Sequence, residues 1–458
     1  MSTHSHSASR RGPARSLTAL LLTLGALLLV SACDEERPPP DYGPIDPLPP
    51  GGGGGSQDAG THSDGGTGGT SDGGTFAARP SCTTGSTSCK GACPDGGVVC
   101  AGNCGFLPAV AYPFPGTTDP EDIAVGDLNG DGYDDLVTAN RQGNTVAILL
   151  NRKGGLFQTP TMLTTGSEPT SVLLSDLNGD QKLDILVANS GDKTFQVFPG
   201  KGDGTFPTVA SYSFGMIVND LAIGDFGGGT RSVAVLRGFL EKLSLLKVES
   251  TGMLREGGMF DAPTSPYALT LEDFNRDGLL DIAMTHSPTC DPASPSCQSV
   301  GVLLGKGDGT FQPQLFTPTG GLPKGLASLH LDTDTLPDLV VADARGNQVL
   351  ALRGGGTGLF YDPPLAYPAG KGAERLALAD VDRDGRTDVL VSNSAENRVS
   401  LLLGRLDGTF STQVPLVAHP QSTTWLQGLA SSDFDKDGSK DVAVLTSSGV
   451  QMLWGICR

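Results

Sequence analysis

The sequence is poor in histidine and in aromatic side chains. Aromatic residues make up 6% of the 458 residues, and there are six histidines, of which only His286, His330 and His419 lie beyond residue 80. Beyond residue 80 there is no His-Glu-x-x-His pair and no nucleophile elbow, so the usual metalloprotease and serine-hydrolase sites lack their residues. We therefore expect no enzymatic activity.

Basic residues are also scarce relative to acidic ones. Lysine and arginine together number 31 against 50 aspartates and glutamates, which gives a net charge of −19. A surface of this sign repels phosphate backbones, so nucleic acid is excluded as a partner.

Long hydrophobic runs are absent except at the start of the chain. Three arginines precede an apolar run from Leu17 to Val30, which is too short for a comfortable membrane span, so residues 1–32 are predicted to be a secretory signal. Val30-Ser31-Ala32-Cys33 resembles the bacterial lipobox. This resemblance implies a lipidated Cys33 and a protein held by lipid alone in a bacterial cell-envelope membrane, on the periplasmic or surface face of the outer membrane. The alternative is an ordinary cleaved signal and a soluble exported protein.

Residues 33–80 begin with Cys33 and contain prolines, five consecutive glycines and Asp-Gly-Gly repeats. They have almost nothing apolar to bury. Such a composition cannot offset the entropy of ordering, so a disordered tether is predicted.

The nine cysteines suggest disulfides, because the chain is predicted to be exported. Segment 81–104 is expected to be a small disulfide-linked unit that contains Cys82, Cys89, Cys93, Cys100 and Cys104. Five cysteines cannot all pair among themselves, and Cys457 is the remaining partner, while Cys290 and Cys297 bracket an inserted loop and are expected to pair. Zinc is the competing interpretation of the cluster, but no histidine lies inside it.

One stretch recurs seven times and organises the rest of the chain. Its first copy runs Asp127-Leu128-Asn129-Gly130-Asp131-Gly132-Tyr133-Asp134-Asp135 and leads into an apolar run. The copies begin at Asp127, Asp176, Asp225, Asp273, His330, Asp380 and Asp433, 48 to 57 residues apart. A period near 50 predicts stacked supersecondary units.

Five copies carry oxygen-bearing side chains at positions 1, 3, 5 and 9, with glycine usual at position 6. Calcium takes six to eight oxygens at about 2.3–2.6 Å, and a short loop of this pattern can surround one ion. The predicted ligands are Asp127, Asn129, Asp131 and Asp135; Asp176, Asn178, Asp180 and Asp184; Asp273, Asn275, Asp277 and Asp281; Asp380, Asp382, Asp384 and Asp388; and Asp433, Asp435, Asp437 and Asp441. Without the ion these carboxylates repel one another, so stability should depend on calcium.

An EF-hand is the rival interpretation of these loops. It needs a bidentate Glu at position 12, where the five copies have Thr138, Val187, Met284, Val391 and Val444. The runs that follow position 9 are short and rich in β-branched residues, which predicts buried strands rather than an exit helix.

Each period divides into four strands, at about 171–176, 183–189, 194–200 and 206–214 in the second copy. A Gly-Lys-Gly-Asp-Gly-Thr-Phe stretch at 200–206 recurs in related form at 305–311, 354–360 and 404–410. It lacks the ending of a phosphate-binding loop, so a hairpin turn is favoured. Bulky and small residues alternate before position 1, as expected of first strands that crowd around an axis. An all-β fold is predicted: a seven-bladed β-propeller of four-stranded blades over 105–458.

Closure of the ring can also be predicted. The seventh unit ends at Trp454 after three strands, and 105–114 matches a fourth strand. The N-terminal strand should therefore complete the last blade and bring Cys104 beside Cys457 for a disulfide.

These motifs together resemble the FG-GAP or VCBS-type repeat family, whose members include the seven-bladed head of integrin α subunits. The resemblance covers about 105–456. It implies calcium in the hairpin between the first two strands of a blade, with a further backbone oxygen from position 7. The position-7 residues are Tyr133, Lys182, Leu279, Arg386 and Ser439.

Three copies depart from the family pattern. The second has Gln181 where glycine is usual, a modest loss, and the third has lost its carboxylates after Asp225 and should bind nothing. The fifth has His330 at position 1 and keeps Asp332, Asp334 and Asp338, so a weak or empty site is expected. We expect five calcium ions, or six if the fifth copy binds.

The function expected from these features is a calcium-binding protein-interaction or adhesion module tethered to the envelope. Its face opposite the calcium loops would meet an envelope or extracellular protein, and the protein itself would be a monomer. The alternative is a lectin-like propeller that binds a glycan, for which Trp425 is the better aromatic candidate and Trp454 is expected in the core. A purely structural envelope protein is a third possibility.

Overall fold

The computed structural model describes residues 98–99, 104–238, 242–262, 266–286, 298–417 and 426–457. All of them belong to the compact unit Gly74–Arg458. Within these ranges no helix is long and apolar enough to cross a membrane. The predictions for the signal, the tether, Cys33, Cys82, Cys89, Cys93, Cys100, Cys290, Cys297, His419 and Trp425 lie outside the described residues.

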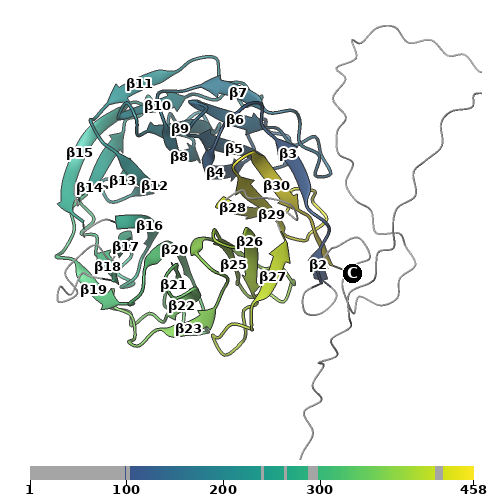
Figure 1. The fold of residues 1–458 in the computed structure, drawn as a ribbon. Helices are drawn as coiled ribbons and strands as arrows, with labels where there is room; N and C mark the ends of the chain where they lie inside the picture. The colour runs from purple at the N-terminus through teal and green to yellow at the C-terminus, as the bar shows by residue number, and fades with distance from the viewer. Residues whose placement is uncertain are drawn as a thin grey trace, which may run out of the picture. The chain divides into compact units, whose positions relative to one another are not determined.

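The described chain is all β and forms seven four-stranded antiparallel blades in a ring (Figure 1). Blade 1 is β4 (Pro120–Gly126), β5 (Asp135–Asn140), β6 (Thr145–Leu149) and β7 (Thr161–Thr164). Blade 2 is β8 (Pro169–Ser175), β9 (Asp184–Asn189), β10 (Thr194–Phe198) and β11 (Ala210–Ser213). Blade 3 is β12 (Val218–Asp225), β13 (Arg231–Arg237), β14 (Lys242–Val248) and β15 (Leu254–Asp261).

The remaining blades repeat the same order. Blade 4 is β16 (Pro266–Glu272), β17 (Asp281–His286), β18 (Ser299–Leu303) and β19 (Leu315–Pro318). Blade 5 is β20 (Pro323–Leu329), β21 (Asp338–Asp343), β22 (Gln348–Leu352) and β23 (Leu365–Pro368). Blade 6 is β24 (Ala373–Ala379), β25 (Asp388–Asn393), β26 (Arg398–Leu402) and β27 (Val414–Val417). Blade 7 is β28 (Leu426–Ser432), β29 (Asp441–Thr446), β30 (Gly449–Leu453) and β3 (Val110–Pro113).

The core consists of seven apolar clusters, each lying between two adjacent blades. The second strand of every blade except the third is a run of six fully buried residues, and β13 is buried over six of its seven. A strand buried on both faces needs a continuous apolar run rather than an alternating one. The apolar runs after position 9 are therefore the centres of the blades.

The first strands face the centre of the ring and the fourth strands form its periphery (Figure 1). Each first strand has a register shift near its start, for example between Pro120 and Asp122 in β4. A bulge of this kind bends the strand and re-aims a side chain. It places polar side chains at the end of each inner strand that is remote from the repeated loops.

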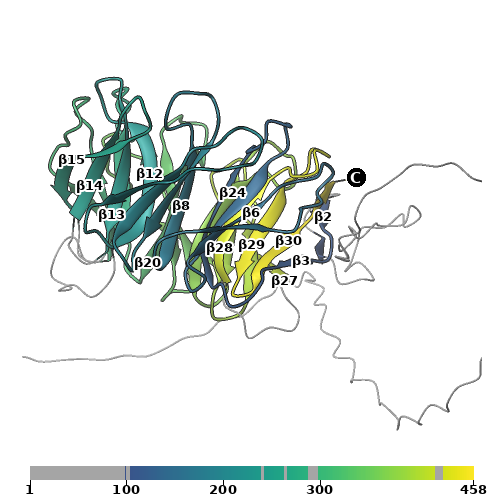
Figure 2. The same ribbon diagram turned by 90° about the horizontal axis from the view of Figure 1, so that it is seen from above.

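The ring closes as predicted, because β3 pairs with β30 and supplies the fourth strand of blade 7 (Figures 1 and 2). The expected continuous strand over 105–114 is, however, divided around Pro108, which has no N–H to donate. Its first part, β2 (Cys104–Phe106), instead joins a separate small sheet between β1 (Val98–Val99) and β31 (Gly455–Cys457). The predicted Cys104–Cys457 disulfide is present in that sheet.

The predicted glycine-rich turns are confirmed as connections between third and fourth strands. Three of them close with isolated bridges, between Gly305 and Phe311, Gly354 and Phe360, and Gly404 and Phe410.

Candidate metal centres

The predicted metal residues lie in the hairpin loops between the first and second strands of the blades. Position 1 directly follows the first strand in six copies and ends it in the third, and position 9 opens the second strand in every copy but the third. All seven blades repeat the same strand order around the ring, so these loops lie on one face.

The position-9 carboxylates are buried and doubly hydrogen-bonded. In Asp441, Oδ2 accepts the N–H of Phe434 at 2.9 Å and Oδ1 accepts the N–H of Gly455 at 2.7 Å. The equivalent two bonds are made by Asp135, Asp184, Asp281, Asp338 and Asp388. All six side chains are at most 1% exposed. Each carboxylate thus joins position 2 of its loop to the residue two beyond the third strand, and we call this pair of bonds the carboxylate tie.

Burial raises the pKa of these carboxylates above the usual aspartate range. The pKa of Asp135 and of Asp281 is raised to about 6, that of Asp388 to about 7 and that of Asp441 to about 8. Neighbouring carboxylates of the same loops add to the effect of burial, Asp435 beside Asp441 being one. Negative charge is therefore under-compensated here, as at a site that would be stabilised by a cation.

Positions 1, 3 and 5 shape the loop by accepting backbone N–H groups. In blade 1, Asp127 accepts the N–H of Gly132 at 2.8 Å, and Asn129 accepts that of Asp131 at 2.9 Å. The N–H of each position-7 residue is donated to the position-5 carboxylate, as from Ser439 to Asp437. Side-chain oxygens consequently turn inward, which is the arrangement a hard cation requires. The position-7 carbonyls stay predicted ligands.

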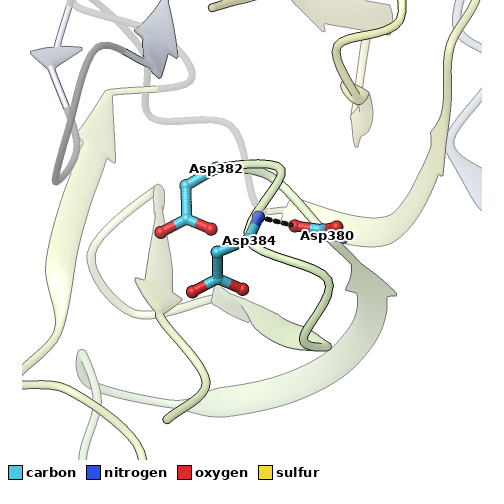
Figure 3. Close-up of side chains that lie close together, drawn as sticks. All are labelled: Asp380, Asp382 and Asp384. Atoms are coloured by element: carbon cyan, nitrogen blue, oxygen red, sulfur yellow. Dashed lines mark hydrogen bonds between the residues drawn. The ribbon is translucent and has the colours of Figure 1, made fainter. Parts of the chain in front are cut away.

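Two loops gather their carboxylates closely. Oxygens of Asp380, Asp382 and Asp384 all lie within 4.8 Å of one another, and so do those of Asp433, Asp435 and Asp441. Figure 3 shows the first group, in which the N–H of Asp384 is donated to Asp380 at 3.0 Å. Buried Oδ1 atoms of Asp382 and Asp433 have no hydrogen-bond partner among the described residues. A carboxylate oxygen that accepts no hydrogen bond and lies in an acidic loop is a suitable ligand for Ca²⁺.

The loops of blades 1, 2 and 4 are built on the same plan, but position 3 there is Asn129, Asn178 or Asn275. In the described part of the chain no other three acidic groups gather within 4.8 Å. An amide oxygen is also a calcium ligand, so the donor set of these loops fits the ion with one negative charge less.

The third and fifth loops differ from the rest, as the sequence predicted. In the third, Gly227 forms a bridge with Asp308 of the blade 4 turn, and a Cβ there would meet the backbone oxygen of Gly307 at 1.9 Å. In the fifth, Asp332 lies 3.8 Å from the guanidinium of Arg353. Arginine thus supplies part of the positive charge at the fifth loop, although Asp338 keeps its carboxylate tie.

Sequence reasoning missed the basic residues at position 4. Arg276, Arg383 and Lys436 adopt left-handed φ values of 59°, 60° and 62° where the first three copies have glycine. Arg383 donates to the backbone oxygen of Asp437 and to Ser439 Oγ, both at 2.8 Å. Arg276 donates to Thr335 at 2.7 Å. Side chains therefore join neighbouring loops. In the sequence, the replacement of glycine by a basic residue at position 4 of the repeat could have indicated these contacts.

A second polar group, also missed, lies at the opposite end of the inner strands. Asp122 accepts the N–H of Val172 of the next blade, and Asp220 accepts that of Leu269. Burial raises the pKa of Asp220 to about 6, while the charge of Arg375 opposes the shift. The ring of Tyr267 lies 4.8 Å from Lys324 Nζ and 5.1 Å from the Arg375 guanidinium. The signal was a polar residue five positions before position 1, as Asp122, Asp220 and Arg375 are, or six before it, as Tyr267 and Lys324 are.

Comparison with known proteins identifies the repeat. A family model described as an FG-GAP-like repeat matches residues 127–187, 176–228, 330–391 and 380–444. Each match begins at position 1 of a copy and runs into the following one, so the register of the repeat is confirmed. No curated protein matches the chain.

Three solved structures share the fold at low sequence identity. A streptogramin B lyase has a TM-score of 0.53 and 12% identity, and the alignment covers 77% of this chain and 98% of that one. BBS1N, solved in complex with ARL6DN, has a TM-score of 0.52 and 11% identity, with 76% and 95% covered. A protein from Lactobacillus plantarum has a TM-score of 0.51 and 14% identity, with 66% and 86% covered.

Proposed function

Because this chain is a β-propeller of FG-GAP-like repeats, a fold that suggests a protein-interaction module, we propose that it is a calcium-binding adhesion or interaction module of a bacterial cell envelope. It would be held to the membrane by lipid on Cys33 and act as a monomer. The observation that carries the calcium assignment is the repeated acidic loop, with carboxylate oxygens within 4.8 Å of one another and raised pKa values at position 9.

Calcium would supply rigidity rather than chemistry. The two carboxylate oxygens of position 9 each accept one N–H and each keep a lone pair for an ion. Five ions would compensate much of the net charge of −19. An ion that binds only the folded protein stabilises it by mass action.

The partner would be an envelope or extracellular protein that meets the face opposite the calcium loops. The polar side chains around Tyr267, Lys324 and Arg375 offer that face charges of both signs and an aromatic ring. Such groups favour a specific polar contact. One structural neighbour was solved in complex with another protein and one is a lyase, so the fold alone does not decide between binding and catalysis.

Binding is preferred to catalysis because no catalytic pair of residues was found in the sequence. A glycan is the second candidate ligand, but Trp454 is fully buried and stacks on Phe157 at 6.4 Å, so it offers no platform for a sugar ring. Binding of the purified protein to a glycan array would favour the lectin function over protein adhesion.

The calcium assignment is tested by melting the purified protein with calcium and with a chelator, and by weighing it under native conditions. Occupancy of several sites should raise the melting temperature by more than about 10 °C. Native mass measurement should give five bound ions, or six if the fifth loop is filled. Equal melting in both buffers, with no bound metal, would refute the proposal.

A further inference from the structure

The small sheet of β1, β2 and β31 connects the sixth and seventh loops. At one end of β31, Gly455 donates its N–H to Asp441 at 2.7 Å, which is one half of the carboxylate tie of the seventh loop. At the other end, Cys457 Sγ lies 3.7 Å from the backbone oxygen of Val381 in the sixth loop. Each of these two loops has four predicted carboxylate ligands, whereas the first, second and fourth loops have three. The sheet therefore contacts the two most acidic loops of the ring.

The Cys104–Cys457 disulfide lies directly against the sixth loop. Cys104 Sγ is 3.4 Å from the backbone oxygen of Asp382, the predicted ligand at position 3, and Cys457 faces the residue before it. Beside the disulfide, Phe106 of β2 is 2% exposed and belongs to the same apolar cluster as Val381. The backbone of positions 2 and 3 is therefore packed against the two sulfur atoms and the strand that they hold.

The disulfide constrains a sheet that is weak by itself. β2 and β31 pair over only three residues, and Cys104 with Cys457 is one of the three pairs. Strands this short form few hydrogen bonds and are not stable alone. The ring stays closed without the disulfide, because β3 pairs with β30 over four residues. Breaking the S–S bond should therefore loosen the small sheet and leave the blades intact.

The oxygens of the sixth loop depend on the backbone that the disulfide supports. Asp382 shares this loop with Asp380 and Asp384 (Figure 3), and its buried Oδ1 accepts no hydrogen bond within the described residues. The position of this oxygen therefore depends on the backbone of Asp382, against which Cys104 packs. Ligand atoms that are already in place lose less freedom when an ion binds, so the affinity is higher.

We propose that the Cys104–Cys457 disulfide controls the sixth metal site through its redox state, an inference that rests on the calcium binding proposed above. A dithiol reduces the S–S bond by thiol–disulfide exchange. The two cysteines take up two electrons and two protons and become thiols, and the dithiol becomes a disulfide. Cys457 is half-buried whereas Cys104 is 6% exposed, so Cys457 is the more accessible sulfur for this exchange.

Reduction should lower the calcium affinity of the sixth loop, because positions 2 and 3 lose the strand that supports them. Coupling between two equilibria is reciprocal. Calcium at the sixth loop should therefore make the disulfide harder to reduce by the same factor.

The first test measures reduction of the unmodified full chain with calcium and with a chelator. Dithiothreitol and its oxidised form set the redox potential, iodoacetamide traps free thiols, and peptide mass spectrometry reports Cys104 and Cys457. Calcium should shift the reduction equilibrium about tenfold toward the disulfide. Asp382→Asn should reduce this shift to less than about twofold, because it removes a ligand of the sixth loop.

The matched control is Asp131→Asn, which removes one charge from the first loop in blade 1. This variant also loses stabilisation by calcium, but it should keep the full shift of about tenfold, because distant sites act independently. Equal shifts in Asp382→Asn and Asp131→Asn would show that calcium acts on the disulfide through overall stability, and would overturn the proposal.

The second test removes the disulfide by Cys104→Ser and Cys457→Ser together. Native mass measurement across a calcium titration should show one ion bound about tenfold more weakly than in the unmodified protein. In chelator, amide hydrogen exchange should become faster across 380–387 and stay unchanged across 127–134. The first test does not depend on the folding of this variant.

The outcomes separate this proposal from the calcium assignment. Unchanged calcium binding and unchanged exchange in the double variant would overturn the redox control alone. Absence of calcium from the unmodified protein would refute the calcium assignment and the redox control together.

Discussion

The seventh loop gathers Asp433, Asp435 and Asp441 within 4.8 Å, whereas the fifth loop, on the same blade scaffold, faces Asp332 toward Arg353. Both nevertheless keep the buried carboxylate tie, through Asp441 and Asp338. The repeat therefore assigns two tasks to its acidic residues. Position 9 holds the blade together in every loop that has it, and positions 1, 3 and 5 are the predicted ion ligands, of which the fifth loop has lost the first.

The largest effect is expected from removing the carboxylate tie of the fifth loop, which lacks a full set of predicted metal ligands. Asp338→Ala leaves the buried N–H groups of Leu331 and Gly354 without acceptors, at about 1–3 kcal/mol each. The unfolding free energy should fall by about 2–5 kcal/mol, equally with calcium and with chelator. Denaturant unfolding in both buffers measures it.

The control for this substitution is Asp334→Ala in the same loop, an exposed position that should change stability little. A stability of Asp338→Ala equal to that of the unmodified protein would mean that position 9 serves the ion alone, contrary to the division of tasks.

Replacing a predicted metal ligand should have a smaller effect on stability, and only when calcium is present. Asp382→Asn removes one charge from the sixth loop without touching the tie of Asp388, so the protein should lose about 1–3 kcal/mol with calcium and bind one ion less. With chelator it should be as stable as the unmodified protein or slightly more so, because like charges are separated. Melting curves and native mass measurement report the two effects.

The equivalent change in the fifth loop, Asp332→Asn, provides the comparison. The number of bound ions should stay the same, since this loop lacks the first aspartate. Loss of an ion on Asp332→Asn would show that the fifth loop is a working site and that Arg353 does not replace the metal.

The sequence predicted the fold in detail because its signals are local and repeated. The period near 50, the apolar runs after position 9 and the glycine-rich turns each recur several times, so accidental patterns average out. Ring closure through β3 followed from one missing strand at each end of the array. The extra sheet of β2 and β31 was not predicted, because two three-residue strands carry too little pattern to stand out.

The candidate site was predicted only in part. Residue types at positions 1, 3, 5 and 9 indicated an ion, but a sequence cannot show that Asp441 also accepts two backbone N–H groups from residues 7 and 14 positions away. The contacts of Arg383 with the next loop depend on how adjacent blades meet. Such contacts join residues about 50 positions apart and leave no pattern within a single repeat.

The smallest expected effect is the response of the position-9 carboxylates to pH without metal, which the two kinds of loop share. Each position-9 carboxylate has a folded-state pKa above its value in the unfolded chain, so the folded protein holds its protons more tightly. This contribution is fully present near pH 4 and is lost as pH rises through about 6, 7 and 8 for Asp135, Asp388 and Asp441. In the presence of chelator, the melting temperature should therefore fall modestly between pH 5 and pH 8.

Calcium should remove or reverse this slope, because the ion binds the ionised form and gains affinity as protons leave. Asp441→Asn isolates the group with the highest pKa, about 8, and should flatten the metal-free curve above neutral pH while leaving the lower part unchanged. Differential scanning calorimetry across the pH range gives both curves. If metal-free stability instead rises through this range, the buried carboxylates are already balanced by charges within the protein.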